Sequence, residues 1–177
     1  CGSSCGNQNS GGMIIRTRDL TDEWMITEMI YESYKPEDTF AIGERIGREA
    51  EPGMLCTLTG DLGVGKTVLT QGIAKGLGIK ECVNSPTFTI VQVYESGRLP
   101  LYHLDVYRIG DIEEMEETGY EDYFFGEGLC IVEWADLIRE LIPEEHTQII
   151  IEKDLEKGFD YRKISVRQPG KGNRLLS

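Results

Sequence analysis

The sequence predicts an α/β fold with a mostly parallel twisted sheet, flanking helices and one antiparallel hairpin. Short apolar runs with β-branched side chains are typical of buried strands. The first of them, at 54–59, leads directly into a glycine-rich segment and then into a helical pattern. Two later runs are separated only by the turn-rich residues 95–98, a spacing that predicts an antiparallel hairpin.

The individual elements follow from local signals. A helix is predicted from Pro36 to about Ala50, because proline is tolerated in a first turn and two carboxylates follow it. Asp111 is a suitable N-cap for a short acidic helix. The other predicted helices cover 67–77, 111–118 and 135–141. The predicted strands are 54–59, 87–94, 99–105, 129–132, 148–152 and 162–166.

Length and composition favour one domain. A chain of 177 residues buries a substantial core. Acidic residues outnumber basic ones by 31 to 18, and this net charge of −13 disfavours direct, tight binding to nucleic acid. No run approaches the ~18 apolar residues of a membrane span, so we expect no membrane association and a cytoplasmic protein. Cys56 and Cys130 lie in apolar runs, which indicates buried thiols.

The segment after the first predicted strand carries the strongest functional signal. It matches Gly-x-x-x-x-Gly-Lys-Thr and reads Gly60-Asp61-Leu62-Gly63-Val64-Gly65-Lys66-Thr67. Glycines at this spacing let backbone N–H groups surround phosphate oxygens at the start of a helix. Lys66 is placed to reach the terminal phosphates, and the Thr67 hydroxyl to bind Mg²⁺. The sequence therefore predicts a P-loop NTPase that binds ATP or GTP with Mg²⁺.

Such an enzyme also needs a carboxylate at the end of a neighbouring strand. Two residues qualify: Glu133 closes an apolar strand, and Asp105 ends the second hairpin strand. We favour Glu133 for Mg²⁺ and Asp105 for organising water or the outer shell of the metal, although either carboxylate is also compatible with an ordinary strand end. His103, two positions before Asp105, is interpreted as a structural residue and not as a catalytic one.

Three further features are open to two interpretations. Ser85, Pro86 and Thr87 follow the first P-loop helix, where many P-loop proteins sense the γ-phosphate, but a plain proline turn would look the same. Trp134 follows Glu133 and is either a nucleotide-sensitive fluorophore or core packing. The aromatic side chains between 102 and 125 lack a basic groove, so we expect core or protein-interface roles for them.

Four motifs in one order resemble the TsaE family. They are Gly60–Thr67, Ser85-Pro-Thr-Phe88, Tyr102-His-Leu-Asp-Val-Tyr-Arg108 and Ile131-Val-Glu-Trp134. The resemblance runs from about Met29 to Val166. It implies a domain at 29–168, a disordered leader or extension at 1–28 and a loose tail at 169–177.

The resemblance implies an ATPase that serves the formation of threonylcarbamoyladenosine at position 37 of tRNA (t6A37), together with TsaB and TsaD. It implies ATP and Mg²⁺ as cofactors, with Lys66, Asp105 and Glu133 as catalytic residues and Thr67 and Glu133 as metal ligands. Ser85 to Thr87 correspond to a switch-like loop. The adenine is expected near Thr39 or near Arg162. Val68 and Ala135 depart from the residues common in the family, but neither replaces a proposed ligand.

The acidic charge fits a subunit that supplies an ATP-dependent conformational step while its partners hold the tRNA. Two other functions remain open from the sequence. One is a small-molecule kinase, although no arginine-rich lid is evident. The other is an interaction module in which ATP binding selects a shape and hydrolysis is incidental.

Overall fold

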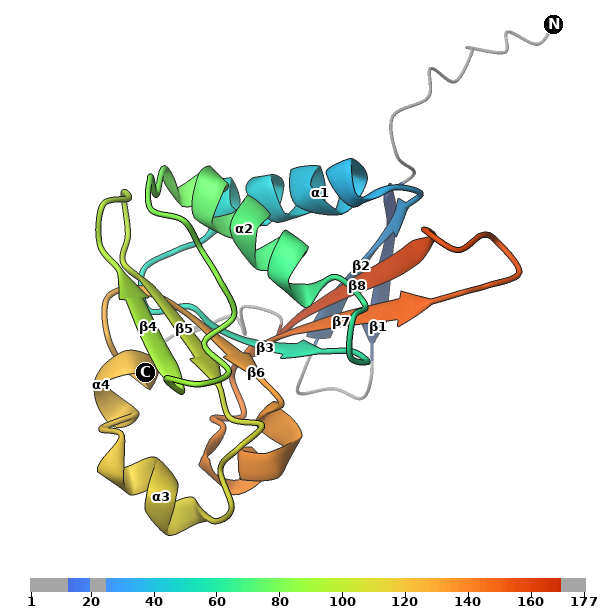
Figure 1. The fold of residues 1–177 in the computed structure, drawn as a ribbon. Helices are drawn as coiled ribbons and strands as arrows, with labels where there is room; N and C mark the ends of the chain where they lie inside the picture. The colour runs from blue at the N-terminus through green and yellow to red at the C-terminus, as the bar shows by residue number, and fades with distance from the viewer. Residues whose placement is uncertain (1–12, 20–24, 170–177) are drawn as a thin grey trace, which may run out of the picture.

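The structure is a computed structural model that describes residues 13–19 and 25–169. Within these residues one eight-stranded sheet has the order β1-β2-β8-β7-β3-β6-β5-β4 (Figure 1). Its strands are β1 (Met13–Asp19), β2 (Met25–Ser33), β3 (Leu55–Thr59), β4 (Val91–Tyr94), β5 (Leu101–Asp105), β6 (Leu129–Glu133), β7 (Thr147–Lys153) and β8 (Arg162–Pro169). The helices are α1 (Pro36–Glu49), α2 (Lys66–Leu77), α3 (Ile112–Glu117) and α4 (Glu121–Phe124), with a 3₁₀ helix η1 (Ala135–Leu141).

Four neighbouring strands at the centre of the sheet, β7, β3, β6 and β5, run parallel. The flanks are antiparallel: β4 pairs with β5 on one side, and β8, β2 and β1 extend the sheet beyond β7 on the other. Parallel strands end at the same edge, so the carboxyl ends of β3, β5 and β6 meet there. The predicted fold class and the predicted hairpin are confirmed.

Helices cover both faces of the sheet. Figure 1 shows α1 and α2 side by side on one face, with α3, α4 and η1 on the opposite side. Leu58 of β3 packs with Leu69 and Ile73 of α2 in the first core. Leu104 and Val132 pack with Met115 of α3 in the second. This two-sided burial explains why the central strands read as continuous apolar runs.

Glycines let α1 and α2 approach each other closely. Gly43 and Gly47 of α1 face Gly72 and Gly76 of α2. A Cβ on Gly47 would lie 2.1 Å from the carbonyl oxygen of Ile73, closer than real Cβ atoms approach any atom. The contact holds α2, which begins at the P-loop, in a fixed place above the sheet.

Two predicted elements differ from the structure. The strand expected at 87–94 begins only at Val91, because the N–H groups of Thr89 and Ile90 donate to the carbonyl of Pro86 in a tight turn. Ile90 has a φ of 64°, which strand geometry does not allow. The helix expected at 135–141 is present as a 3₁₀ helix interrupted by non-helical backbone at Ile138. The short helix α4 was not predicted.

Part of the segment that was expected to be a leader, 1–28, pairs with the sheet. Strand β1 and the first residues of β2 fall inside it, and they pair in antiparallel register. The pairing satisfies N–H and C=O groups of β2 on the side that β8 leaves free. The rest of the expected leader, and the expected tail after Pro169, lie outside the described residues. No helix in the described part of the chain is long and apolar enough to span a membrane.

Candidate nucleotide-binding site

A cavity of about 350 Å³ lies at the carboxyl edge of the parallel strands. Its walls come from the P-loop, the loop before β4, and the ends of β5 and β6. The lining residues are Leu62, Gly63, Gly65, Lys66, Thr67, Ser85, Thr87, Asp105, Tyr107, Glu133 and Trp134. The cavity thus brings together predicted phosphate, metal and switch-loop residues from four separate parts of the sequence.

The P-loop connects β3 to α2 through backbone that suits glycine. Gly65 has a φ of 110° as the N-cap of α2, a conformation that L side chains rarely adopt. At Gly60 a Cβ would lie 2.7 Å from the carbonyl oxygen of Ile151, so this position has no space for a side chain. The loop therefore presents the positive N-terminal end of α2 to the cavity, as an anion site requires.

Lys66 is the cation of the site. Its side chain is buried, and Nζ donates to the carbonyl oxygens of Gly60 at 2.8 Å and Asp61 at 3.3 Å. Nζ also lies 4.0 Å from Glu133 Oε2 and 4.7 Å from the centre of the Trp134 ring. A buried ammonium with these partners is compensated within the protein and stands at the cavity wall.

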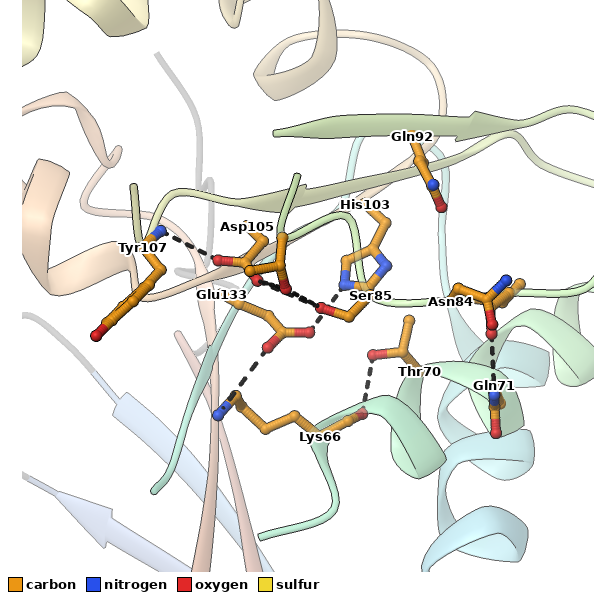
Figure 2. Close-up of polar contacts among 12 residues, drawn as sticks. Lys66, Thr70, Gln71, Asn84, Ser85, Gln92, His103, Asp105, Tyr107 and Glu133 are labelled. Carbon is orange, nitrogen blue, oxygen red and sulfur yellow. Dashed lines mark hydrogen bonds and ion pairs between the residues drawn. The ribbon is translucent and has the colours of Figure 1, made fainter. Parts of the chain in front are cut away.

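Glu133 is fixed from behind by a histidine. Its side chain is buried, and Oε1 lies 2.9 Å from Nε2 of His103 on the neighbouring strand β5 (Figure 2). The other carboxylate oxygen is the one closer to Lys66. The predicted structural role of His103 therefore includes a direct contact with a predicted site residue, which the sequence did not indicate.

Asp105 is bonded to the predicted switch loop. Its Oδ2 accepts a hydrogen bond from Thr87 Oγ1 at 2.9 Å, and Ser85 Oγ lies 3.3 Å from the same oxygen. Its Oδ1 accepts from the backbone N–H of Tyr107 at 3.1 Å. Figure 2 shows Asp105 and Ser85 directed toward each other from different elements. Both carboxylate oxygens thus have donors from the chain itself.

Trp134 closes one wall through an unusual backbone conformation. Its φ is 62°, which is rare for a bulky residue. The turn carries the indole over Lys66 and against the ring of Tyr107, whose centroid lies 4.9 Å away. Sequence reasoning noted Trp134 but gave no reason to expect this geometry.

The remaining predicted site residues lie outside the cavity lining. Arg162 donates from Nε to the carbonyl of Val64 at 2.7 Å, so it braces the P-loop from the first residue of β8. Thr39 is buried in α1, with Oγ1 2.8 Å from Ser33 Oγ. Gly60, Asp61, Val64 and Pro86 contribute to the loops around the cavity without lining it.

Known proteins match the part of the chain that contains these site residues. The family model described as "Threonylcarbamoyl adenosine biosynthesis protein TsaE" matches residues 33–164, a span that includes the P-loop, Asp105 and Glu133. The chain belongs to the TsaE family. The resemblance drawn from the sequence is confirmed.

Individual TsaE relatives match most of the chain. A Bacillus subtilis protein named tRNA threonylcarbamoyladenosine biosynthesis protein TsaE is 47% identical over 149 residues, which cover 84% of this chain and 91% of the relative. A Treponema pallidum protein of the same name is 42% identical over 112 residues, covering 63% and 82%. The crystal structure of Bacillus subtilis YdiB has a TM-score of 0.70 at 43% identity, covering 81% of this chain and 87% of that one.

Proposed function

We propose that this TsaE-family chain is a Mg²⁺-dependent ATPase subunit required for t6A37 modification of tRNA, acting with TsaB and TsaD. The pathway is supported by the names of its relatives. The observation that carries the ATPase proposal is the convergence of Lys66, Thr67 and Glu133 on one cavity. We expect the protein to act in the cytoplasm, where ATP and tRNA are present.

The P-loop supplies the phosphate site. Backbone N–H groups at the start of α2 would donate hydrogen bonds to the phosphate oxygens. Lys66 would exchange its bonds to two carbonyl oxygens for charge-assisted bonds to phosphate. Charge-assisted bonds are stronger than bonds to neutral carbonyls, so this exchange favours the bound state. Lys66 is thus the residue whose removal should weaken nucleotide binding and hydrolysis most directly.

The donor set at the cavity fits Mg²⁺. Thr67 and Glu133 offer a hydroxyl and a carboxylate oxygen, which are hard ligands of the kind that Mg²⁺ selects. Among the described residues no three His, Cys, Asp or Glu side chains gather to hold a metal on their own. Waters and phosphates would therefore complete the coordination, as is usual for Mg²⁺. When bound, Mg²⁺ would neutralise charge that develops on the phosphates.

The loop of Ser85, Pro86 and Thr87 is the proposed sensor of the γ-phosphate. Asp105 holds it through the Thr87 hydroxyl. A γ-phosphate would compete for the hydroxyl donors, and its attacking water for the carboxylate, because these groups line the cavity beside Glu133. Asp105 would then couple the position of the loop to the state of the nucleotide. This role is compatible with organising water during hydrolysis.

The adenine is proposed to lie on the side of the P-loop where Arg162 and Thr39 are found. Arg162 contacts the loop main chain at Val64, and α1 packs along α2. With these side chains bonded to the protein, we expect their contribution to be the shape of the base site.

A kinase is less well supported than an ATPase. The cavity lining contains one cationic side chain, that of Lys66, and no arginine. Kinases of small molecules close arginines over both substrates. The partner-dependent ATPase is therefore the function that the site supports best, with the acidic charge leaving tRNA contact to TsaB and TsaD.

The test is ATP hydrolysis by the full chain, first alone and then with TsaB, TsaD and tRNA, for wild type and Lys66→Ala. Phosphate release that rises with the partners and is lost in Lys66→Ala supports the proposal. Hydrolysis at the same rate with and without the partners would indicate a stand-alone ATPase. Transfer of phosphate to an added metabolite would indicate a kinase. Normal t6A formation by a variant that binds ATP without hydrolysing it would indicate an interaction module.

A further inference from the structure

A buried histidine lies behind the proposed metal ligand. His103 has no exposed surface, and its Nε2 lies 2.9 Å from Glu133 Oε1 (Figure 2). We propose that His103 is a positioning residue that holds Oε1 of Glu133, so that Oε2 stays turned toward Lys66 and the Mg²⁺ site. The inference rests on the proposed function, because it assigns Glu133 to Mg²⁺.

The hydrogen-bonding of the imidazole supports this role. A carboxylate only accepts hydrogen bonds, so the contact with Glu133 requires the proton on Nε2. Nδ1 is also buried, and it has no hydrogen-bond partner in the described structure. Burying a polar atom unpaired is unfavourable, and an apolar side chain would fill the same space without that loss. The contribution particular to the imidazole here is its N–H group for Glu133.

The sheet makes the contact rigid. In the parallel pairing of β5 with β6, His103 is opposite Ile131 and Asp105 is opposite Glu133. His103 therefore reaches Glu133 across the diagonal between two neighbouring buried strands. Oε2 of Glu133 lies 4.0 Å from Lys66 Nζ. A hydrogen bond to one oxygen of a carboxylate fixes the direction in which the other oxygen points. Hydrogen-bond partners of metal ligands commonly have this effect.

Two substitutions of similar chemistry separate positioning from packing. In His103→Gln the amide nitrogen reaches about as far as Nε2, whereas in His103→Asn it reaches only about as far as Nδ1. Leu104→Ala is the matched control, since Leu104 is the fully buried neighbour of His103 on β5 and packs in the core that contains Met115 of α3. The measurement is the affinity of the full chain for a non-hydrolysable ATP analogue by calorimetry, with Mg²⁺ and with EDTA.

We expect Mg²⁺ to strengthen binding in wild type, in His103→Gln and in Leu104→Ala. In His103→Asn the gain from Mg²⁺ should fall by about tenfold or more, while the affinity in EDTA stays unchanged. Equal gains in His103→Asn and His103→Gln would overturn the inference, and so would an equal loss of affinity in EDTA and in Mg²⁺.

Glu133→Gln separates this inference from the proposed function. If Glu133→Gln keeps the full gain from Mg²⁺, the metal role of Glu133 is wrong and the positioning role falls with it. If Glu133→Gln loses the gain but His103→Asn does not, the function stands and only the positioning role is wrong.

Discussion

Replacing Gly47 with alanine should destabilise the protein, although alanine is the better helix former. In an exposed helix the change would stabilise by up to ~1 kcal/mol. Here the new Cβ would lie 2.1 Å from the carbonyl oxygen of Ile73 and 2.9 Å from its carbonyl carbon. Both are backbone atoms of α2 and cannot rotate away, so the helices must separate. Overpacking of this kind costs roughly 1–3 kcal/mol, and we expect a net loss of about 1–2 kcal/mol.

Urea unfolding of Gly47→Ala against wild type measures this loss as a lower midpoint at unchanged slope. Ala41→Gly is the control, because Ala41 is an exposed residue of the same helix and reports helix propensity alone. Its expected loss is about 1 kcal/mol. The reasoning is refuted if Gly47→Ala raises the midpoint, since propensity would then outweigh the contact between α1 and α2. Because α2 begins at the P-loop, we also expect weaker nucleotide binding in Gly47→Ala.

Arg162→Met should lower both stability, by roughly 1–3 kcal/mol, and ATP affinity, because it leaves two half-buried carbonyl groups without this donor, those of Val64 in the P-loop and of Tyr161; unchanged unfolding and calorimetry would contradict the bracing role. Burial raises the pKa of Cys56 to about 12, so in the native protein this thiol should resist maleimide while the exposed Cys82 reacts, as peptide mapping can show; equal labelling rates would be inconsistent with the buried core. Hydrogen bonds from Lys157 and Tyr161 hold the pKa of Glu32 below its usual value, so the bonded carboxylate adds stability that is present at neutral pH and lost as the pH falls through the lowered pKa. The stability difference between wild type and Glu32→Gln should therefore shrink on acidification, and a difference independent of pH would exclude this linkage.

The parts of the site that the sequence predicted depend on local chemistry. The P-loop is a run of consecutive residues whose glycines, lysine and threonine each have a role in one turn. Asp105 and Glu133 could be placed near the P-loop because each one ends a strand, and parallel strands end at the same edge of the sheet. The hairpin of β4 and β5 followed from a short turn between two apolar runs.

The parts that could not be predicted depend on distant contacts. The hydrogen bond between Arg162 and Val64 joins residues 98 positions apart, and the sequence around neither residue predicts it. Strand β4 begins later than predicted because the N–H groups of Thr89 and Ile90 donate to the carbonyl of Pro86 and not to a neighbouring strand. Strand β1 forms by pairing with the free edge of β2, and this edge exists only once the sheet has formed. The glycine contacts between α1 and α2 became evident only when both helices were placed.

The central claim is that the cavity between the P-loop, Asp105 and Glu133 binds ATP with Mg²⁺ through Lys66. Calorimetric titration of a non-hydrolysable ATP analogue into wild type and Lys66→Ala, with Mg²⁺ present, tests it directly. Losing a charge-assisted bond to phosphate should weaken binding about tenfold or more. Equal affinities for the two proteins would contradict the account, because they would place the nucleotide away from this cavity.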